Sequence, residues 1–428
     1  MTTQENEANE DFRPRVRPIE MFPAEVEGQT VVCVRDTMQL VEEVLTMTPL
    51  AGLIVALFDG SKTLPEIAEV VRQELGQEVA VEEIGRLAEG LDERFLLVSD
   101  KFAGYYEKLV AEFAARERRP AFLADKSYPA DPGQLRELLE SFFTTDGGPG
   151  LPTGPGDGPP LRGLVAPHID LVNGGACFAH AYHALASAEP ADVFVVLGTG
   201  HSGARGLFVA TDKAFETPLG NVETDQDFVG RLQANFGDDL LQDEILHRTE
   251  HVIEFQALFL QLLFGDRRPF KIVPLLCSYV PEMTQPEATP EHMARIEAFG
   301  KALRSTIRET AGKVCVIASV DLAHMGPRYG DQEPLTPDGL RQLNEDDGRT
   351  LALLAAGDRE AFNEDMLGHC ATRRICGYPC LDTMLACGDF ADGKLLIYDQ
   401  AQVDDAGSVV SFAGMAFAGK AAASGESR

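Results

Sequence analysis

The chain has 428 residues, and its 37 Lys and Arg against 68 Asp and Glu give a formal net charge of −31. Affinity for nucleic acids and anionic membranes comes largely from neutralised phosphates, so this charge argues against nucleic-acid and membrane-surface binding. The length predicts two or three domains at about 150 residues each, and a hydrophobic content of 44% suffices for their cores.

The first residues, MTTQENEANEDF, are polar and acidic and do not resemble a secretion signal. No window approaches 18 uninterrupted apolar residues, so no membrane-spanning helix is expected. The eight cysteines form no evenly spaced framework and are interpreted as reduced thiols. We therefore expect a soluble cytoplasmic protein, with disordered tails at residues 1–12 and 421–428.

Residues 13–110 are predicted to form a small, mostly helical domain. "PLAGLIVALFDGS" is predicted to be an apolar helix, and in "TLPEIAEVVRQELG" Thr63 and Glu66 form a capping box that opens a second helix ending at Gly76. A third helix carries Ile84 and Leu91, and "RFLLVSD" is typical of a short closing strand. Two short helices followed by a strand indicate a winged helix-turn-helix outline.

The charge of this module argues against DNA binding, because residues 13–119 hold 13 Lys and Arg against 20 Asp and Glu. Through its "DG(S)xTLxEI" and "LxxRFLL" features the module resembles the winged-helix peptide-recognition domains of peptide-modifying pathways, such as the carrier domain of pyrroloquinoline quinone biosynthesis. The resemblance implies a peptide or protein partner for residues 13–110. A structural appendage or a dimerisation domain is the alternative interpretation.

Residues 111–420 are predicted to form an α/β domain. Asp131 and Pro132 open an amphipathic helix, and the Gly/Pro-rich stretch at 144–160 is expected to be a loop within this domain. Continuous Val/Ile/Leu runs then alternate with helical periods, which indicates a sheet covered by helices on both faces. The expected strands are "LRGLVAPH", "DVFVVLGTGH", "KIVPLLCS", "KVCVIASVDLAH", "KLLIYDQAQ" and "VVSFAGMAFAG".

Histidines follow three of these strands. His168 ends "LVAPH", His201 ends "FVVLGTGH", and Asp321 and His324 end "CVIASVDLAH". Ligands of α/β sheets bind at the carboxyl ends of the strands, so we expect these side chains to converge. Since neutral imidazole is the commonest protein metal ligand, the pattern predicts a metal site; hydrogen-bonded rim histidines are the alternative.

A metal site needs a further donor, and "HCATRRICGYPC" offers His369, Cys370, Cys376 and Cys380. Its spacing does not match a self-contained zinc knuckle, but one thiolate from it could complete a site on distant strands. In "TEHVIEFQ", His251 and Glu254 are three residues apart on a predicted helix and therefore share a face. They could orient a ligand or water, or cap the helix.

Together these motifs resemble the Memo family, whose members share the fold of class III extradiol dioxygenases. The resemblance covers roughly residues 116–420. It is carried by "SYPADPGQLRELL", "APHIDLVNGG", "VVLGTGHSG", "TPLGNVETDQDF", "EHVIEFQ", "SVDLAHMG", "RRICGYPCLDTML" and "YDQAQ" followed by "SVVSFAGMAF".

The resemblance implies one metal ion held by His168, His201 and Cys376. It implies catalytic roles for His324 and Asp321, with His324 as an acid–base oriented by Asp321, and a substrate-lining pair of His251 and Glu254. Two departures occur near the site. The family's "APHAGY" is "APHIDL" here, which adds Asp170 as a candidate substrate-binding residue, and a family histidine is replaced by Gln256.

Two histidines and one anionic donor are typical of non-heme Fe(II) oxygenases, and a thiolate softens the site toward copper or zinc. We therefore expect a mononuclear metal cofactor, foremost Fe(II), in an iron-dependent oxidoreductase resembling a dioxygenase. A non-catalytic metal- and peptide-binding protein, and zinc-assisted hydrolysis, are the alternatives. The family resemblance further implies a radical S-adenosylmethionine enzyme as a partner.

Overall fold

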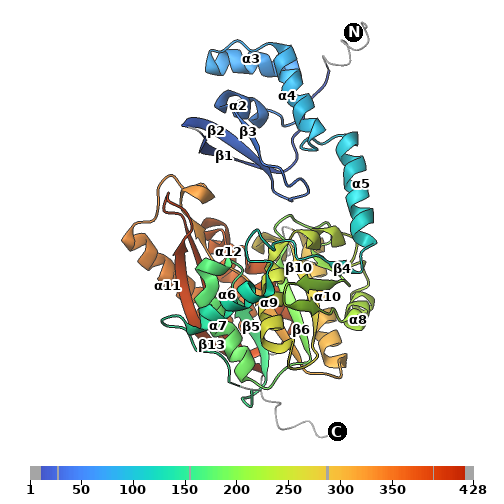
Figure 1. Ribbon diagram of the computed structural model, residues 1–428, viewed down its shortest axis with the longest axis vertical. Helices are drawn as coiled ribbons and strands as arrows, with labels where there is room; N and C mark the ends of the chain where they lie inside the picture. Colours follow the sequence, from blue (N-terminus) through green and yellow to red (C-terminus); the bar gives the residue numbers. More distant parts are fainter. Residues whose placement is uncertain (1–10, 27, 154–155, 286–288, 389, 420–428) are drawn as a thin grey trace. The chain divides into compact units, whose positions relative to one another are not determined.

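The computed structural model describes residues 11–26, 28–153, 156–285, 289–388 and 390–419. The tail predicted at 421–428 lies outside these ranges, as does nearly all of the tail predicted at 1–12. The chain divides into two compact units, Met1–Ala115 and Arg116–Arg428 (Figure 1). The boundary predicted between residues 110 and 111 falls inside helix α5 (Asp100–Ala114).

The first unit begins with a three-stranded antiparallel sheet in the order β1-β2-β3. Its strands are β1 (Ile19–Val26), β2 (Gln29–Asp36) and β3 (Leu45–Met47), and the helices that follow are α2 (Pro49–Ala56), α3 (Leu64–Leu75), α4 (Val81–Glu93) and α5. The predicted capping box of Thr63 and Glu66 is confirmed, as is the left-handed cap at Gly76 with φ 64°. These local signals fix both ends of α3.

The strand predicted at "RFLLVSD" is wrong. Phe95 turns the chain with φ 59°, and the segment forms an isolated bridge between Leu97 and Val16 in place of a strand. Leu96 and Leu97 are buried, so their apolarity reflects burial beneath helices and not a strand. The antiparallel sheet lies before the helices, in a stretch where the sequence analysis predicted no strand.

The second unit is built on an eight-stranded mixed sheet, in the order β12-β14-β5-β11-β6-β10-β7, with β13 paired to β14. Its four central strands, β5 (Leu161–Ala166), β11 (Val314–Ser319), β6 (Val193–Thr199) and β10 (Lys271–Cys277), are parallel. The outer strands are β7 (Phe208–Ala210), β12 (His324–Met325), β13 (Phe390–Gln402) and β14 (Val409–Gly419). All six predicted strands are confirmed. A second, small sheet contains β4 (Arg118–Arg119), β8 (Ala214–Thr217) and β9 (Gly220–Val222).

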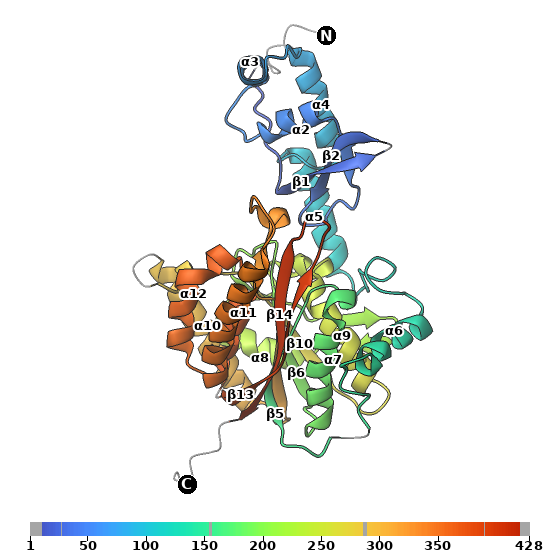
Figure 2. The same ribbon diagram turned by 90° about the vertical axis from the view of Figure 1, so that its left-hand side faces the viewer.

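Helices cover both faces of the large sheet, which confirms the predicted α/β class (Figure 2). One layer contains α6 (Pro132–Thr144), α7 (Leu171–Ser187) and α9 (His251–Phe264). The other contains α8 (Gln226–Phe236), α10 (Pro290–Glu309), α11 (Pro337–Ala356), α12 (Arg359–Arg373) and α13 (Tyr378–Cys387). Short 3-10 helices are η1 (Glu244–Arg248), η2 (Pro281–Thr284) and η3 (Pro327–Tyr329). Within the described ranges, the search for helices able to cross a membrane identifies none.

The topology determines where the polar strand ends meet. Strands β5, β11 and β6 are neighbours and run in the same direction. His168, Asp321 and His201 each stand two residues beyond the end of their strand. Their side chains therefore emerge side by side at one edge of the sheet, as predicted.

Candidate metal centre

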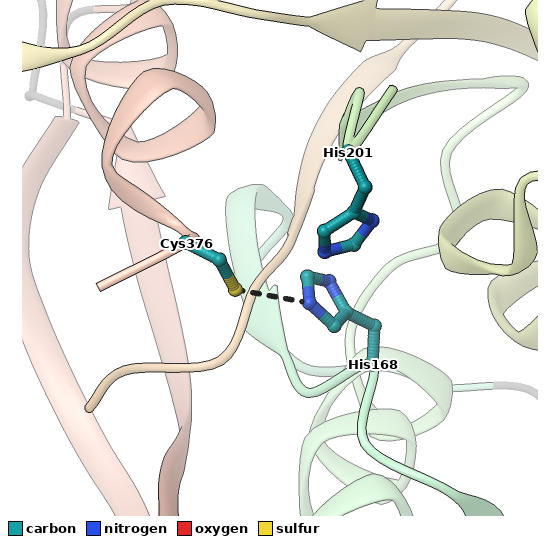
Figure 3. Close-up of side chains that lie close together, drawn as sticks. All are labelled: His168, His201 and Cys376. Carbon is teal, nitrogen blue, oxygen red and sulfur yellow. Dashed lines mark hydrogen bonds between the residues drawn. The ribbon is translucent and has the colours of Figure 1, made fainter. Parts of the chain in front are cut away.

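Two histidines and a cysteine gather at this edge. One nitrogen each from His168 and His201 and the Sγ of Cys376 all lie within 4.8 Å of one another (Figure 3). The Nε2 of His168 is 3.2 Å from Sγ of Cys376. The three residues come from the ends of β5 and β6 and from the turn between α12 and α13, so the cluster depends on the folded sheet.

His168 is held rigidly in one tautomer. Its Nδ1 is 2.9 Å from the carbonyl oxygen of Ser319, and since a carbonyl only accepts, Nδ1 carries the hydrogen and Nε2 keeps a lone pair. The backbone N–H of His168 donates to Oδ1 of Asp321 at 3.0 Å. Burial lowers the pKa of His168 well below its usual value. The imidazole is therefore neutral, as a metal ligand must be.

His201 is oriented by a carboxylate that the sequence analysis missed. Its Nδ1 and its backbone N–H contact the two carboxylate oxygens of Glu250, each at 3.1 Å. Burial lowers the pKa of His201, but the charges and hydrogen bonds of Glu250 and Cys376 together outweigh burial and raise that pKa well above the usual value. A metal ion at Nε2 would have to displace a proton, so binding would release protons.

Cys376 reaches the cluster because its turn packs closely against the end of β11. The Thr199 hydroxyl donates to the carbonyl of Cys376 at 3.0 Å, and Gly377 N–H donates to the carbonyl of Asp321 at 3.2 Å. A Cβ on Gly377 would lie only 2.5 Å from a side-chain atom of Val320, so glycine permits this approach. Burial raises the pKa of the Cys376 thiol, and a bound cation would favour its thiolate.

His251 belongs to the same group. Its ring lies parallel to that of His201, with centroids 5.3 Å apart, and its Nδ1 is 3.1 Å from Oε1 of Glu250. Glu250 thus serves both rings, and the two histidines and their carboxylate form a second compact set of donor atoms. The position of Glu250 directly before His251 at the start of α9 was the signal in the sequence that could have identified it.

Glu254 lies elsewhere, which corrects the expectation that it lines the cleft with His251. Its side chain is fully buried and pairs with Arg119 at 2.5 Å. It also accepts from the Leu123 N–H at 2.9 Å and from the Tyr128 hydroxyl. Helix α9 is buried on nearly all sides, so a residue three positions from His251 points into the core and secures the segment before α6.

Asp170, the candidate substrate-binding residue, has a local role at the start of α7. Its Oδ1 accepts from the backbone N–H groups of Val172 and Asn173, which caps α7. Its Oδ2 accepts from the side chain of Asn173 at 2.7 Å. Both oxygens are therefore used by the first turn of the helix.

His324 is not oriented by Asp321, contrary to the expectation. Its Nδ1 lies 3.2 Å from the carbonyl of Leu322 and 3.1 Å from that of Arg374, so Nε2 again keeps a lone pair. Asp321 instead lies beside the cluster, with Oδ2 3.6 Å from Nε2 of His168. Burial raises the pKa of Asp321 to about 6 and lowers that of His324 to about 4.

The neighbouring candidates His369 and Cys380 join no metal-sized cluster among the residues that the structure describes. His369 is about half exposed on α12, near Asp365, and Cys380 is buried in α13. A cavity of about 340 Å³ adjoins the cluster and is lined by His201 and Cys376. Much of the remaining lining is apolar, including Val280, Met283 and Ile375.

Comparison with known proteins shows which family the chain resembles. The family model described as "Memo-like protein" matches residues 118–416. A MEMO1 family protein of Aquifex aeolicus is 27% identical over 410 residues, which cover 95% of this chain and 100% of the relative. MEMO1 family protein MK0963 of Methanopyrus kandleri is 36% identical over 214 residues, covering 49% of this chain and 70% of the relative.

MEMO1 family protein TTHA0924 of Thermus thermophilus is 29% identical over 300 residues, covering 70% of this chain and 82% of the relative. The family match spans more than half of the chain and includes every member of the candidate metal centre. The chain therefore belongs to the Memo-like protein family.

Proposed function

We propose that this protein binds a single metal ion through His168, His201 and Cys376 and is an oxidoreductase that depends on it. The observation that carries the proposal is the convergence of three suitable donor atoms within 4.8 Å of one another. Two of them are imidazole nitrogens whose rings are held through their other nitrogen, by Ser319 and Glu250. Such outer contacts orient the ligands of protein metal sites.

The donor set fits Fe(II) best among the ions expected, with copper and zinc as alternatives. Two imidazoles and one anionic donor suit Fe(II), and the thiolate also suits Cu(I) and Zn. When bound, the ion would supply redox and Lewis-acid chemistry at positions that the protein leaves open. The adjoining cavity of about 340 Å³ gives a small substrate room beside Cys376 and His201.

His324 is the residue that we assign to proton transfer. Its Nδ1–H is hydrogen-bonded to two carbonyl groups, so the lone pair on Nε2 can accept a proton from a substrate. With its pKa lowered to about 4 by burial, the ring is neutral at pH 7 and available as a base. Asp321, with its pKa raised to about 6, is a second proton carrier beside His168.

The test separates metal binding from turnover. Anaerobically purified protein is loaded with Fe(II), and O₂ consumption is measured with a panel of small catechols and peptides. His324→Gln should retain the metal and lower the rate about 10²–10⁴-fold, the usual contribution of a general base. Equal rates of O₂ consumption in His324→Gln and the wild type would mean that His324 is not the general base. Metal retention with no O₂ consumption for any substrate would count against the oxidoreductase itself.

A second function, non-catalytic binding of a peptide partner, is favoured by the first unit. Strand β1 is at the edge of its sheet, and it exposes Met21, Phe22 and Val26. Edge strands with exposed apolar side chains are suited to partner binding. A radical S-adenosylmethionine enzyme, or its peptide substrate, is the partner to test. Co-purification that Phe22→Asp abolishes and the exposed Leu75→Asp does not would support this function.

A further inference from the structure

Helix α9 contains a buried glutamine among mostly apolar neighbours. Gln256 is completely inaccessible to solvent, and the other buried residues of the helix are apolar apart from Glu254. A buried amide lowers stability unless its hydrogen bonds are made inside the protein, whereas leucine would fill a similar volume without that cost. The contacts of the amide therefore decide what this residue contributes.

Each polar atom of the amide has a defined role. Nε2 of Gln256 donates to the carbonyl of Pro167 and to the hydroxyl oxygen of Ser319, at 2.8 Å each. Oε1 accepts from the hydroxyl of Tyr182 at 2.8 Å. The Ser319 hydroxyl donates its own hydrogen to the carbonyl of Val252 at 2.7 Å. Because carbonyl oxygens only accept, the direction of every bond in this network is fixed.

The two acceptors of Gln256 are the residues that hold His168. Pro167 directly precedes His168, and the carbonyl of Ser319 accepts from Nδ1 of His168 at 2.9 Å. Proline has no N–H, so the carbonyl of Pro167 is its only main-chain hydrogen-bonding group. One side chain thus fixes both the backbone before the imidazole and the strand end that orients the ring.

His168 and His201 are therefore held in different ways. His201 contacts the carboxylate of Glu250, whereas the network of Tyr182, Gln256 and Ser319 behind His168 is uncharged. All three of these residues are fully buried, so water does not compete for their hydrogen bonds. Since the network adds no charge beside the cluster, it can act on His168 only by fixing its position.

We propose that Gln256 is a positioning residue of the metal centre, which acts through Pro167 and Ser319 to hold Nε2 of His168 where it meets the metal ion. This inference rests on the proposed function, because it concerns the same ion. Outer contacts that orient a ligand typically change metal affinity about 10–100-fold. A purely structural role, in which the network only ties α7 and α9 to the sheet, is the competing explanation.

Titration of the full-length, metal-free protein with Co(II) separates the two explanations, because the visible absorption of bound Co(II) depends on the geometry of its ligands. Gln256→Leu removes the amide at a similar side-chain volume. It should weaken Co(II) binding about 10–100-fold in competition with a chelator. At saturating Co(II), its absorption spectrum should differ from that of the wild type.

Thr306→Val is the matched control. Thr306 is also fully buried in α10, and its hydroxyl donates to the carbonyl of Ala302 and accepts from Asn235, at 2.9 Å each. The next residue, Ile307, lines a cavity together with Val314 at the amino end of β11, away from the metal centre. Thr306→Val should therefore change neither the Co(II) affinity nor the spectrum.

Wild-type affinity and spectrum in Gln256→Leu would overturn the proposal, as would an equal loss of affinity in Thr306→Val. Circular dichroism verifies that each variant is folded. Where Gln256→Leu does not fold, Tyr182→Phe takes its place. It leaves Oε1 of Gln256 without its donor and should weaken Co(II) binding about fivefold, the usual value of one hydrogen bond; unchanged binding would then overturn the proposal.

The same titration distinguishes a failure of this inference from a failure of the proposed function. Absence of Co(II) binding in the wild type would overturn the metal centre itself, and this inference with it. Co(II) binding in the wild type that Gln256→Leu leaves unchanged would overturn only the positioning role of Gln256.

Discussion

At the residue scale, the candidate metal centre depends on which nitrogen of each imidazole is hydrogen-bonded to the protein and which is left for a ligand. His168, His201 and His324 all engage Nδ1 with an oxygen acceptor, so Nε2 is the nitrogen that faces a ligand. For His201 the acceptor is the carboxylate of Glu250. A carboxylate bound to a histidine ligand increases the basicity of the ring and fixes its orientation.

Glu250→Gln is therefore expected to weaken metal binding. The amide could still accept from His201, but it would lose the negative charge that offsets a bound cation. Loss of such an outer contact typically costs about 10–100-fold in metal affinity, which competition with a chelator can measure. Glu223→Gln, on the exposed side chain at the end of β9, is the control. Equal affinities in the two variants would mean that Glu250 does not support the metal site.

His247 provides a prediction about pH. It is buried in η1 with Nε2 3.1 Å from the carbonyl of Val209, and burial lowers its pKa from 6.5 to about 3. The folded state thus resists protonation more than the unfolded state does. Below pH 6.5 the unfolded state binds a proton at His247 that the folded state does not bind. The contribution of His247 to the free energy of unfolding is therefore fully present above pH 6.5 and is lost progressively as the pH falls toward 3.

At pH 5 this loss should amount to about 2 kcal/mol of unfolding free energy. His247→Gln keeps a donor for Val209 but cannot be protonated. Between pH 7 and pH 5, its unfolding free energy from urea titrations should fall by about 2 kcal/mol less than that of the wild type. Substitution of the exposed His292 by Gln is the control. An equal fall of the unfolding free energy in His247→Gln and the wild type would contradict the assignment of this pH dependence to His247.

At the element scale, the parallel strands β5, β11 and β6 determine which residues meet. His168, Asp321 and His201 could be predicted to converge because each follows an apolar strand and parallel strands share one carboxyl edge. Cys376 could not be found this way, since it lies in a turn between helices, and only the family motif indicated it. Glu250 was missed because helical spacing drew attention to Glu254.

Glu254 shows why spacing on one helix was insufficient. The i, i+3 relation places two residues on one side of a helix, but it does not say which part of that side is covered by another segment. Here residues 119–128 cover Glu254 and supply its ion pair with Arg119 and its hydrogen bonds with Leu123 and Tyr128. Gln256, two residues further, reaches the other way and donates to the carbonyl of Pro167 at 2.8 Å, which ties α9 to the residue before His168.

Glu254→Gln should therefore destabilise the protein and leave its metal content unchanged. Removing the charge leaves Arg119 buried without its counterion, a change that typically costs about 3–5 kcal/mol. Chemical unfolding measures the loss, and elemental analysis measures the metal. Glu140→Gln, in a largely exposed pair with Arg136, should cost less than about 1 kcal/mol. Loss of metal with an unchanged free energy of unfolding would mean that Glu254 acts in the cleft beside the metal centre and not in the core.

At the scale of the whole molecule, the candidate donors all belong to residues 116–428. This unit has its own sheet and its own buried cores. The relative from Aquifex aeolicus aligns over 95% of the chain, so the alignment includes both units. In the first unit, β1 and β3 lack the continuous apolar runs that identified the strands of the second unit, whereas the run Val31–Val34 in β2 was overlooked.

Residues 116–428, produced alone, are expected to bind metal with the affinity and stoichiometry of the full chain. The reason is that every ligand and orienting residue, including Ser319 and Glu250, is inside this unit. Metal titration of the two proteins makes the comparison. A folded fragment that binds no metal, beside a full chain that does, would show that the first unit contributes to the site.

The central claim is that His168, His201 and Cys376 form a metal site. The most direct measurement is the metal content of anaerobically purified protein by mass spectrometry, beside a variant with all three residues changed to Ala. We predict close to one equivalent of metal, foremost iron, in the wild type and none in the variant. Equal metal content in the two proteins, or none in either, would contradict the claim.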